Sequence, residues 1–129
     1  MGGDLESATP ARALVIEDDD LSAELLRLML ARLGVAAHVA RDGATGLQAF
    51  ISDHFKLVLV DIKLPDANGL DVVRQLRAQS TSVRLLVVSG SNMLDDAEKR
   101  RTAGFDGFLM KPFSFEQFAE QVKPLLKKQ

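Results

Sequence analysis

The chain has 129 residues, of which 47% are hydrophobic and 26% are charged, and this length and balance fit one ordinary globular domain. It contains no cysteine, which excludes disulfides, thiolate metal sites and a cysteine nucleophile. The formal net charge of −2 gives no broad basic field, so we expect no direct nucleic-acid binding, and no apolar run approaches the ~20 residues of a membrane-spanning helix. We therefore expect a cytoplasmic protein, with residues 1–11 as a flexible lead-in or linker and residues 12–129 as the folded domain.

Five short, apolar, strand-like runs alternate along the chain with stretches of helical spacing. These runs occupy residues 13–16, 35–39, 57–60, 83–88 and 107–110. The third run, Leu57-Val58-Leu59-Val60, is apolar on both faces, as expected of a central strand in a parallel sheet with helices on both sides.

Helical spacing between and after these runs predicts five helices. Gly34 ends the first, Gly104 ends the fourth (about residues 94–103), and Ser114 with Gln117 forms a capping box at the start of the fifth. Pro124 lies inside the fifth helix and predicts a bend or an end there. The side chains that mark the helical faces are Leu21, Leu25, Leu28, Met29 and Leu33 in the first helix, Leu47, Ala49, Phe50 and Ile51 in the second, Leu70, Val73, Leu76 and Arg77 in the third, and Phe115, Phe118, Val122 and Leu125 in the fifth.

This alternation of strands and helices predicts an α/β fold with a doubly wound, five-stranded parallel sheet. Folds of this kind bind their ligands at the carboxyl ends of the strands. The residues that directly follow each strand are therefore the candidates for a functional site.

Polar side chains stand at four of the five predicted strand ends. Glu17 and Asp18 follow the first strand, Asp61 ends the third, Ser89 ends the fourth, and Lys111 follows the fifth. Carboxylates brought to one rim repel each other unless a cation lies between them, and hard oxygen ligands suit Mg²⁺. Glu17, Asp18 and Asp61 are the candidate ligands.

A carboxylate beside Mg²⁺ can also act as a nucleophile that attacks phosphorus and becomes an aspartyl phosphate. That chemistry needs a second cation on the phosphoryl group, for which Lys111 is placed, and a short hydroxyl donor, for which Ser89 is placed. The next two acids, Asp19 and Asp20, are expected at the start of the first helix, where a carboxylate caps free N–H groups.

Four segments of the sequence resemble the response-regulator receiver family, which includes the single-domain chemotaxis regulators. They are LVIEDDD (14–20), LVLVDIKLPDANGLD (57–71), LLVVSGS (85–91) and AGFDGFLMKPFS (103–114), and the resemblance spans about residues 12–128. It implies a (βα)5 flavodoxin-like fold and a two-component signalling switch, which takes a phosphoryl group from a histidine kinase or a histidine phosphotransfer protein.

The same resemblance implies a role for each site residue. Asp61 is the phosphoacceptor, and Glu17, Asp18, Asp61 and the backbone carbonyl of Lys63 bind Mg²⁺. Lys111 pairs with the phosphate and precedes a cis Lys111–Pro112 bond. Ser89 and Phe108 are the switch residues, which change the output face formed by the fourth helix, fifth strand and fifth helix.

The resemblance implies further that the protein is a monomer or weak dimer, either stand-alone or the receiver of a larger hybrid kinase or regulator. It implies no enzyme activity beyond self-catalysed phosphotransfer and autodephosphorylation. Lys63 is an unusual cation at the mouth of the site, and we hypothesise that its side chain shields the phosphate and slows hydrolysis.

Other interpretations of these residues stay open at this point. A Mg²⁺-dependent phosphohydrolase would use the same nucleophile but needs a second Asp at the position of Lys63, and a pseudo-receiver would dock partners without taking phosphate. Asp18 could only cap the first helix, Lys111 could form only a structural ion pair with Asp61, and Phe108 could be only a core aromatic.

Overall fold

The computed structural model describes residues 11–90 and 103–127, and within them five parallel strands form one sheet. The strands are β1 (Ala11–Ile16), β2 (Val35–Ala40), β3 (Leu57–Asp61), β4 (Arg84–Ser89) and β5 (Gly107–Met110). Their order is β2-β1-β3-β4-β5, and every neighbouring pair is parallel. The predicted doubly wound parallel sheet is confirmed.

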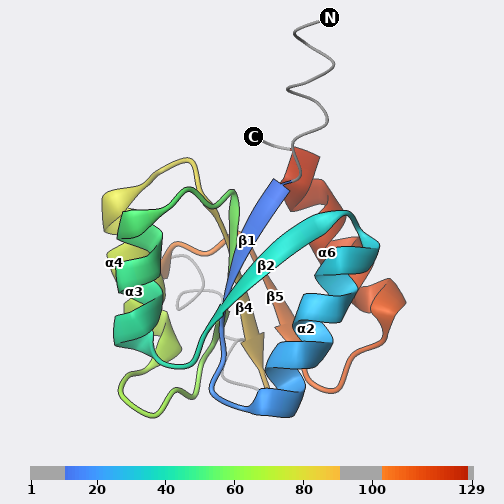
Figure 1. Cartoon of the computed structure of the whole chain (residues 1–129), viewed down its shortest axis with the longest axis horizontal. Coiled ribbons are helices and arrows are strands. Elements are labelled where there is room, and N and C mark those ends of the chain that lie inside the picture. Colours follow the sequence, from blue (N-terminus) through green and yellow to red (C-terminus); the bar gives the residue numbers. More distant parts are fainter. Residues whose placement is uncertain (1–10, 91–102, 128–129) are drawn as a thin grey trace, which may run out of the picture.

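Helices cover both faces of this sheet, with α3 (Gly43–Ser52) and α4 (Gly69–Gln79) on one side and α2 (Asp20–Arg32) and α6 (Phe115–Lys127) on the other (Figure 1). Side chains alternate between the two faces along β1. Leu14 and Ile16 are buried in the core on the α3 and α4 side, whereas Ala13 and Val15 are buried in the core on the α2 and α6 side. The sequences of the central strands are continuously apolar because each face of the sheet packs against its own hydrophobic core.

Each of these helices begins at a polar side chain that accepts a hydrogen bond from a free backbone N–H. Asp19 accepts from Ser22 N, Asp42 from Thr45 N, and Asn68 from Leu70 N. The predicted capping box at α6 is present, since Gln117 N donates to Ser114 Oγ at 3.1 Å and Ser114 N donates to Gln117 Oε1 at 2.8 Å.

The apolar side chains that marked the face of the first helix in the sequence are not the ones that the structure buries. Leu21, Leu25 and Leu28 are exposed by 81%, 46% and 49%, whereas Met29 and Leu33 are only partly buried. The side chains of α2 that are buried in the core are Ala23, Leu26 and Leu30. Both sets have helical spacing, so the helix carries two apolar stripes, and the sheet contacts the one whose small Ala23 permits a close approach.

Three further predictions about helices meet different outcomes. Ile51 of α3 is exposed by 62%, so it does not belong to the buried face of that helix. Pro124 does not end α6, which continues to Lys127. The predicted fourth helix lies outside the described residues except for Ala103, and Gly104, which follows it, has the positive φ of 86° that is common just past a helix.

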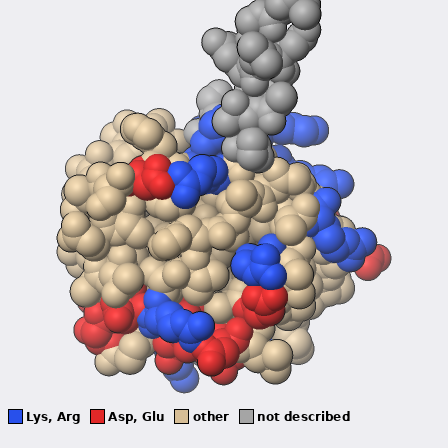
Figure 2. Space-filling model, viewed as in Figure 1, with Lys and Arg blue, Asp and Glu red and all other residues tan. Residues whose placement is uncertain are grey.

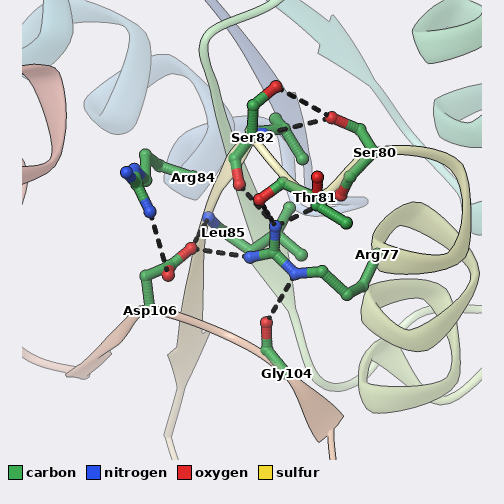
Figure 3. Close-up of polar contacts among 9 residues, drawn as sticks. Arg77, Ser80, Thr81, Ser82, Arg84, Leu85, Gly104 and Asp106 are labelled. Carbon is green, nitrogen blue, oxygen red and sulfur yellow. Dashed lines mark hydrogen bonds and ion pairs between the residues drawn. The ribbon is translucent and has the colours of Figure 1, made fainter. Parts of the chain in front are cut away.

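Arg77, at the end of α4, joins the starts of β4 and β5 at the edge of the sheet where these strands begin (Figure 3). Its guanidinium donates to three carbonyls of the α4–β4 loop, to the Gly104 carbonyl at 3.0 Å and to Asp106 Oδ2 at 2.8 Å. Asp106 Oδ2 also accepts from Leu85 N at 2.8 Å. The Arg77 guanidinium thereby holds the three chain segments together, through backbone carbonyls and through a half-buried ion pair with Asp106.

No helix among residues 11–90 and 103–127 is both long enough and apolar enough to cross a membrane.

Candidate functional site

The predicted site residues meet at the edge of the sheet where the parallel strands end. Glu17 directly follows β1, Asp61 is the last residue of β3, Ser89 is the last residue of β4, and Lys111 directly follows β5. Because β3 lies between β1 and β4, Asp61 has acidic residues on one side and Ser89 on the other. On the face that Figure 2 draws, acidic side chains gather toward this edge, with Lys and Arg side chains among them.

Three carboxylates form the acidic part of this site. One oxygen from each of Glu17, Asp18 and Asp61 lies within 4.8 Å of the others. Glu17 is 1% exposed, Asp61 is half-buried and Asp18 is exposed. A hard divalent cation with some of its waters retained, such as Mg²⁺, fits this all-oxygen set, which is open to solvent on the Asp18 side.

Lys111 supplies the cation that the protein itself brings to these acids. Its Nζ lies 2.7 Å from Glu17 Oε1 and 3.1 Å from Asp61 Oδ2. Lys111 therefore holds Asp61 and Glu17 through one ammonium group. The predicted pairing of Lys111 with Asp61 is present, and the Lys111–Pro112 peptide bond is cis as predicted.

Burial and the neighbouring charges shift the pKa values of two side chains in this site, Glu17 and Lys111. Burial and the neighbouring Asp61 carboxylate raise the pKa of Glu17 to about 7, although the Lys111 ammonium opposes the change. Burial lowers the pKa of Lys111, but its contacts with Glu17 and Asp61 raise it by more, so that its pKa lies above the usual value. Lys111 is therefore charged near neutral pH.

The loop after β3 holds the Asp61 carboxylate from the other side. Lys63 N donates to Asp61 Oδ1 at 3.0 Å, while the Lys63 side chain is exposed. The role of the Lys63 carbonyl as a metal ligand stays a prediction. Gly69 closes this loop against β3, where a Cβ at that position would lie 2.1 Å from the Asp61 carbonyl oxygen. Only glycine permits this approach, and the Asn-Gly pair at 68–69 was the available signal for it.

The two predicted switch residues lie on neighbouring strands. Ser89 is 3% exposed and its carbonyl accepts a hydrogen bond from Lys111 N at 2.8 Å. Phe108 is partly buried against the core on the α3 and α4 side. The backbone at Ser89 thus positions Lys111 directly, whereas a movement of either switch residue stays a prediction.

One alternative for the acidic residues is now resolved. The N-cap of α2 is Asp19, so Asp18 is not needed as a helix cap. Asp20 forms an ion pair with Arg41 at the surface. Sequence reasoning missed Asp66 altogether and assigned Arg77 only to a helical face, although both side chains bind distant backbone groups.

Comparisons with known proteins agree with this geometry. The family model of the response regulator receiver domain matches residues 13–123. The chain is 34% identical over 117 residues to the transcriptional regulatory protein QseB of Haemophilus influenzae, covering 91% of this chain and 53% of that protein. It spans about half the length of the curated relatives it matches.

Two solved structures are similar to the whole domain. A response regulator receiver domain protein (CheY-like) from Methanospirillum hungatei has a TM-score of 0.85 at 26% identity, over 93% of this chain and 97% of that one. The response regulator TrrA of Thermotoga maritima, in complex with Mg(2+)-BeF, has a TM-score of 0.82 at 27% identity, over 89% of this chain and 98% of that one.

Proposed function

Because the chain belongs to the response regulator receiver domain family, we propose that it is a phosphoacceptor switch of a two-component system, with Asp61 as the acceptor. One observation carries the proposal. The Asp61 carboxylate lies 3.1 Å from Lys111 Nζ and beside two further carboxylates, Glu17 and Asp18, with which it could hold a divalent cation. An in-line attack of a carboxylate on phosphorus needs a neighbouring cationic side chain and a metal ion bound beside the carboxylate.

The reaction takes place at a carboxylate oxygen of Asp61. That oxygen forms a bond to the phosphorus of a phosphohistidine, the N–P bond breaks, and the histidine imidazole leaves with a proton from solvent. Mg²⁺ held by Glu17, Asp18, Asp61 and the Lys63 carbonyl would neutralise charge on the phosphoryl oxygens. Lys111 is close enough to pair with another of these oxygens, and Lys63 N keeps the second Asp61 oxygen in place.

In the phosphorylated state, the phosphoryl group on Asp61 carries a charge of about −2. We propose that this charge draws the Ser89 hydroxyl inward and that Phe108 repacks behind it. Such a change shifts the population between two packings of the surface that includes β5 and α6. The predicted fourth helix of this output face lies outside the described residues.

A histidine kinase or a histidine phosphotransfer protein is the proposed donor. The surface beside the acceptor suits an apolar partner helix, because Leu21, Leu25 and Leu28 are exposed along α2. Leu25 also lines a hollow of about 220 Å³ together with Lys111 and Phe113. A Leu25→Glu variant is expected to lose transfer from its kinase while it still takes phosphate from a small donor, since only the protein donor touches this surface.

We propose no further catalytic activity for the domain beyond its own phosphorylation and dephosphorylation. A phosphohydrolase with the same nucleophile would need an acid at position 63, where Lys63 stands. We propose two arrangements for the full protein. In one, the domain is a stand-alone switch. In the other, it controls a DNA-binding domain elsewhere in the protein, because several relatives are named transcriptional regulatory proteins. A cytoplasmic location stays a prediction.

Acetyl phosphate provides the direct test, because it delivers a phosphoryl group without a kinase. We expect the protein to become phosphorylated with acetyl phosphate and Mg²⁺, but not after EDTA treatment and not in an Asp61→Asn variant. A wild-type protein that stays unphosphorylated would overturn the proposal in favour of a pseudo-receiver. Repeated turnover of small phosphoesters would overturn it in favour of a hydrolase.

A further inference from the structure

Asp66 lies in the loop between β3 and α4 and binds the start of a different helix. Its Oδ1 accepts a hydrogen bond from Gly43 N at 2.8 Å, and its Oδ2 accepts one from Ala44 N at 3.0 Å. Both N–H groups belong to the first turn of α3. These two bonds hold the pKa of Asp66 below its usual value, so the side chain is ionised near neutral pH.

The first turn of α3 has a second cap besides Asp66. Asp42, the residue just before the helix, already accepts a hydrogen bond from Thr45 N at 2.7 Å. Both acids are therefore bound to the same helix end, but Asp42 comes from the β2–α3 turn and Asp66 comes from the loop that follows Asp61. Asp66 therefore satisfies two further free N–H groups of α3 and at the same time joins the loop that follows Asp61 to this helix.

The rest of the loop is fixed mainly at its two ends. Lys63 N donates to Asp61 Oδ1, Lys63 pairs with Asn68 in an antiparallel bridge, and Gly69 N donates to the Ile62 carbonyl at 2.7 Å. Between these ends, Leu64 and Ala67 pack against the core, but such apolar contacts are not directional. Among the described contacts, Asp66 makes the hydrogen bonds that fix the tip of the loop.

Helix α3 also touches the strand that carries the other acids. A Cβ on Gly46 would lie 2.4 Å from Ile16 Cδ1, so the α3 backbone rests directly on Ile16. The next residue is Glu17, whose N donates to the Ala40 carbonyl at 2.9 Å just ahead of α3. The start of α3 is thus a common support for the Asp61 loop and for the Glu17 end of the site.

We propose that Asp66 is a positioning residue of the phosphoacceptor site. Asp66 binds the loop between β3 and α4 to α3. It thereby keeps Asp61 and the Lys63 carbonyl at the distance from Glu17 and Asp18 that a shared Mg²⁺ requires. This inference rests on the proposed function. Groups that orient metal ligands without touching the metal typically change metal affinity by 10–100-fold when removed.

The test compares Asp66→Ala with Asp42→Ala in Mg²⁺ titrations of the full chain by calorimetry. Each variant removes one carboxylate that caps the same helix end, so the net charge changes equally, but only Asp66 also joins the loop that follows Asp61 to that end. We expect Asp66→Ala to weaken Mg²⁺ binding about tenfold or more, and Asp42→Ala to leave it unchanged. Asp66→Asn keeps one acceptor oxygen, so we expect an intermediate affinity, and this variant also serves if Asp66→Ala does not fold.

A phosphorylation assay separates the possible failures. With acetyl phosphate at low Mg²⁺, Asp66→Ala should react slowly, and high Mg²⁺ should largely restore its rate. Equal losses in the two alanine variants, or no loss in Asp66→Ala and Asp66→Asn, would overturn the positioning role. Absence of labelling in the wild-type protein would instead overturn the proposed function.

Discussion

Replacing Arg77 with alanine removes a side chain that joins the end of α4 to the starts of β4 and β5. Five hydrogen bonds are lost, to the carbonyls of Ser80, Thr81, Val83 and Gly104 and to Asp106. The Arg77 and Asp106 side chains are only 22% and 25% exposed. The change also leaves Asp106 with Leu85 N and the more distant Arg84 as its partners.

The magnitude follows from the partial burial of this ion pair. A hydrogen bond to a charged group contributes about 1.5–3 kcal/mol, and removal of one partner of a fully buried pair costs about 3–5 kcal/mol. Water can reach part of this site and the individual bonds are not additive. We therefore expect a loss of about 3 kcal/mol in the free energy of unfolding, which in a domain of this size lowers the melting temperature by roughly 12 °C.

Urea unfolding followed by circular dichroism measures this loss, with Arg74→Ala as the matched control. Arg74 lies on the same helix and pairs with Asp71 at the surface, so its removal should cost less than about 0.5 kcal/mol. The phosphoacceptor site lies at the opposite ends of the strands, and labelling of Arg77→Ala well below its melting temperature should equal that of the wild type. A loss below about 1 kcal/mol, or equal losses in the two variants, would refute the reasoning.

Three further predictions concern the site itself. The Lys63→Ala variant should lose its aspartyl phosphate faster than the native chain; a native lifetime that is equal or shorter rejects the shielding hypothesis. Because the pKa of Glu17 is about 7, a proton competes with Mg²⁺ below that pH. Calorimetric Mg²⁺ affinity should therefore rise about tenfold from about pH 6 to about pH 8, and Glu17→Gln should bind more weakly and lack this rise. Gly69→Ala places a Cβ 2.1 Å from the Asp61 carbonyl oxygen, whereas a Cβ at Gly90 meets nothing within 4 Å. The first variant should lose more than about 2 kcal/mol in urea unfolding and the second almost none; similar stabilities would contradict the packing argument.

The sheet and the main site residues could be predicted because both follow from local patterns. Short runs apolar on both faces identify central parallel strands, and the carboxyl ends of such strands meet at one edge. The sequence positions of Glu17, Asp61 and Lys111 relative to these runs were therefore enough to bring them together. The structure places Lys111 Nζ within 3.1 Å of both acids.

The orientation of α2 could not be predicted in the same way. Leu21, Leu25 and Leu28 have the spacing of a buried stripe, but so do Ala23, Leu26 and Leu30. Periodicity identifies the helix without deciding which of two apolar faces meets the sheet. That choice depends on how closely the helix can approach β1, a property of the packed structure.

Asp66 and Arg77 escaped prediction because their partners are distant backbone groups. Asp66 binds N–H groups 22 and 23 residues away, and Arg77 binds the Gly104 carbonyl 27 residues away. No short motif links such positions, and an exposed Asp in a turn suggests only local capping. Side chains that bind the backbone of another element become visible only when the elements are assembled.

The central proposal for this protein is that Asp61 is the phosphorylated residue. Mass spectrometry of peptides, after incubation with acetyl phosphate and Mg²⁺ and with hydroxylamine as a probe for acyl phosphates, locates it directly. We predict a single hydroxylamine-sensitive phosphoryl group on Asp61, which is absent after EDTA treatment. Phosphate on Asp18 or Ser89 in place of Asp61, or a hydroxylamine-resistant product, would contradict the account.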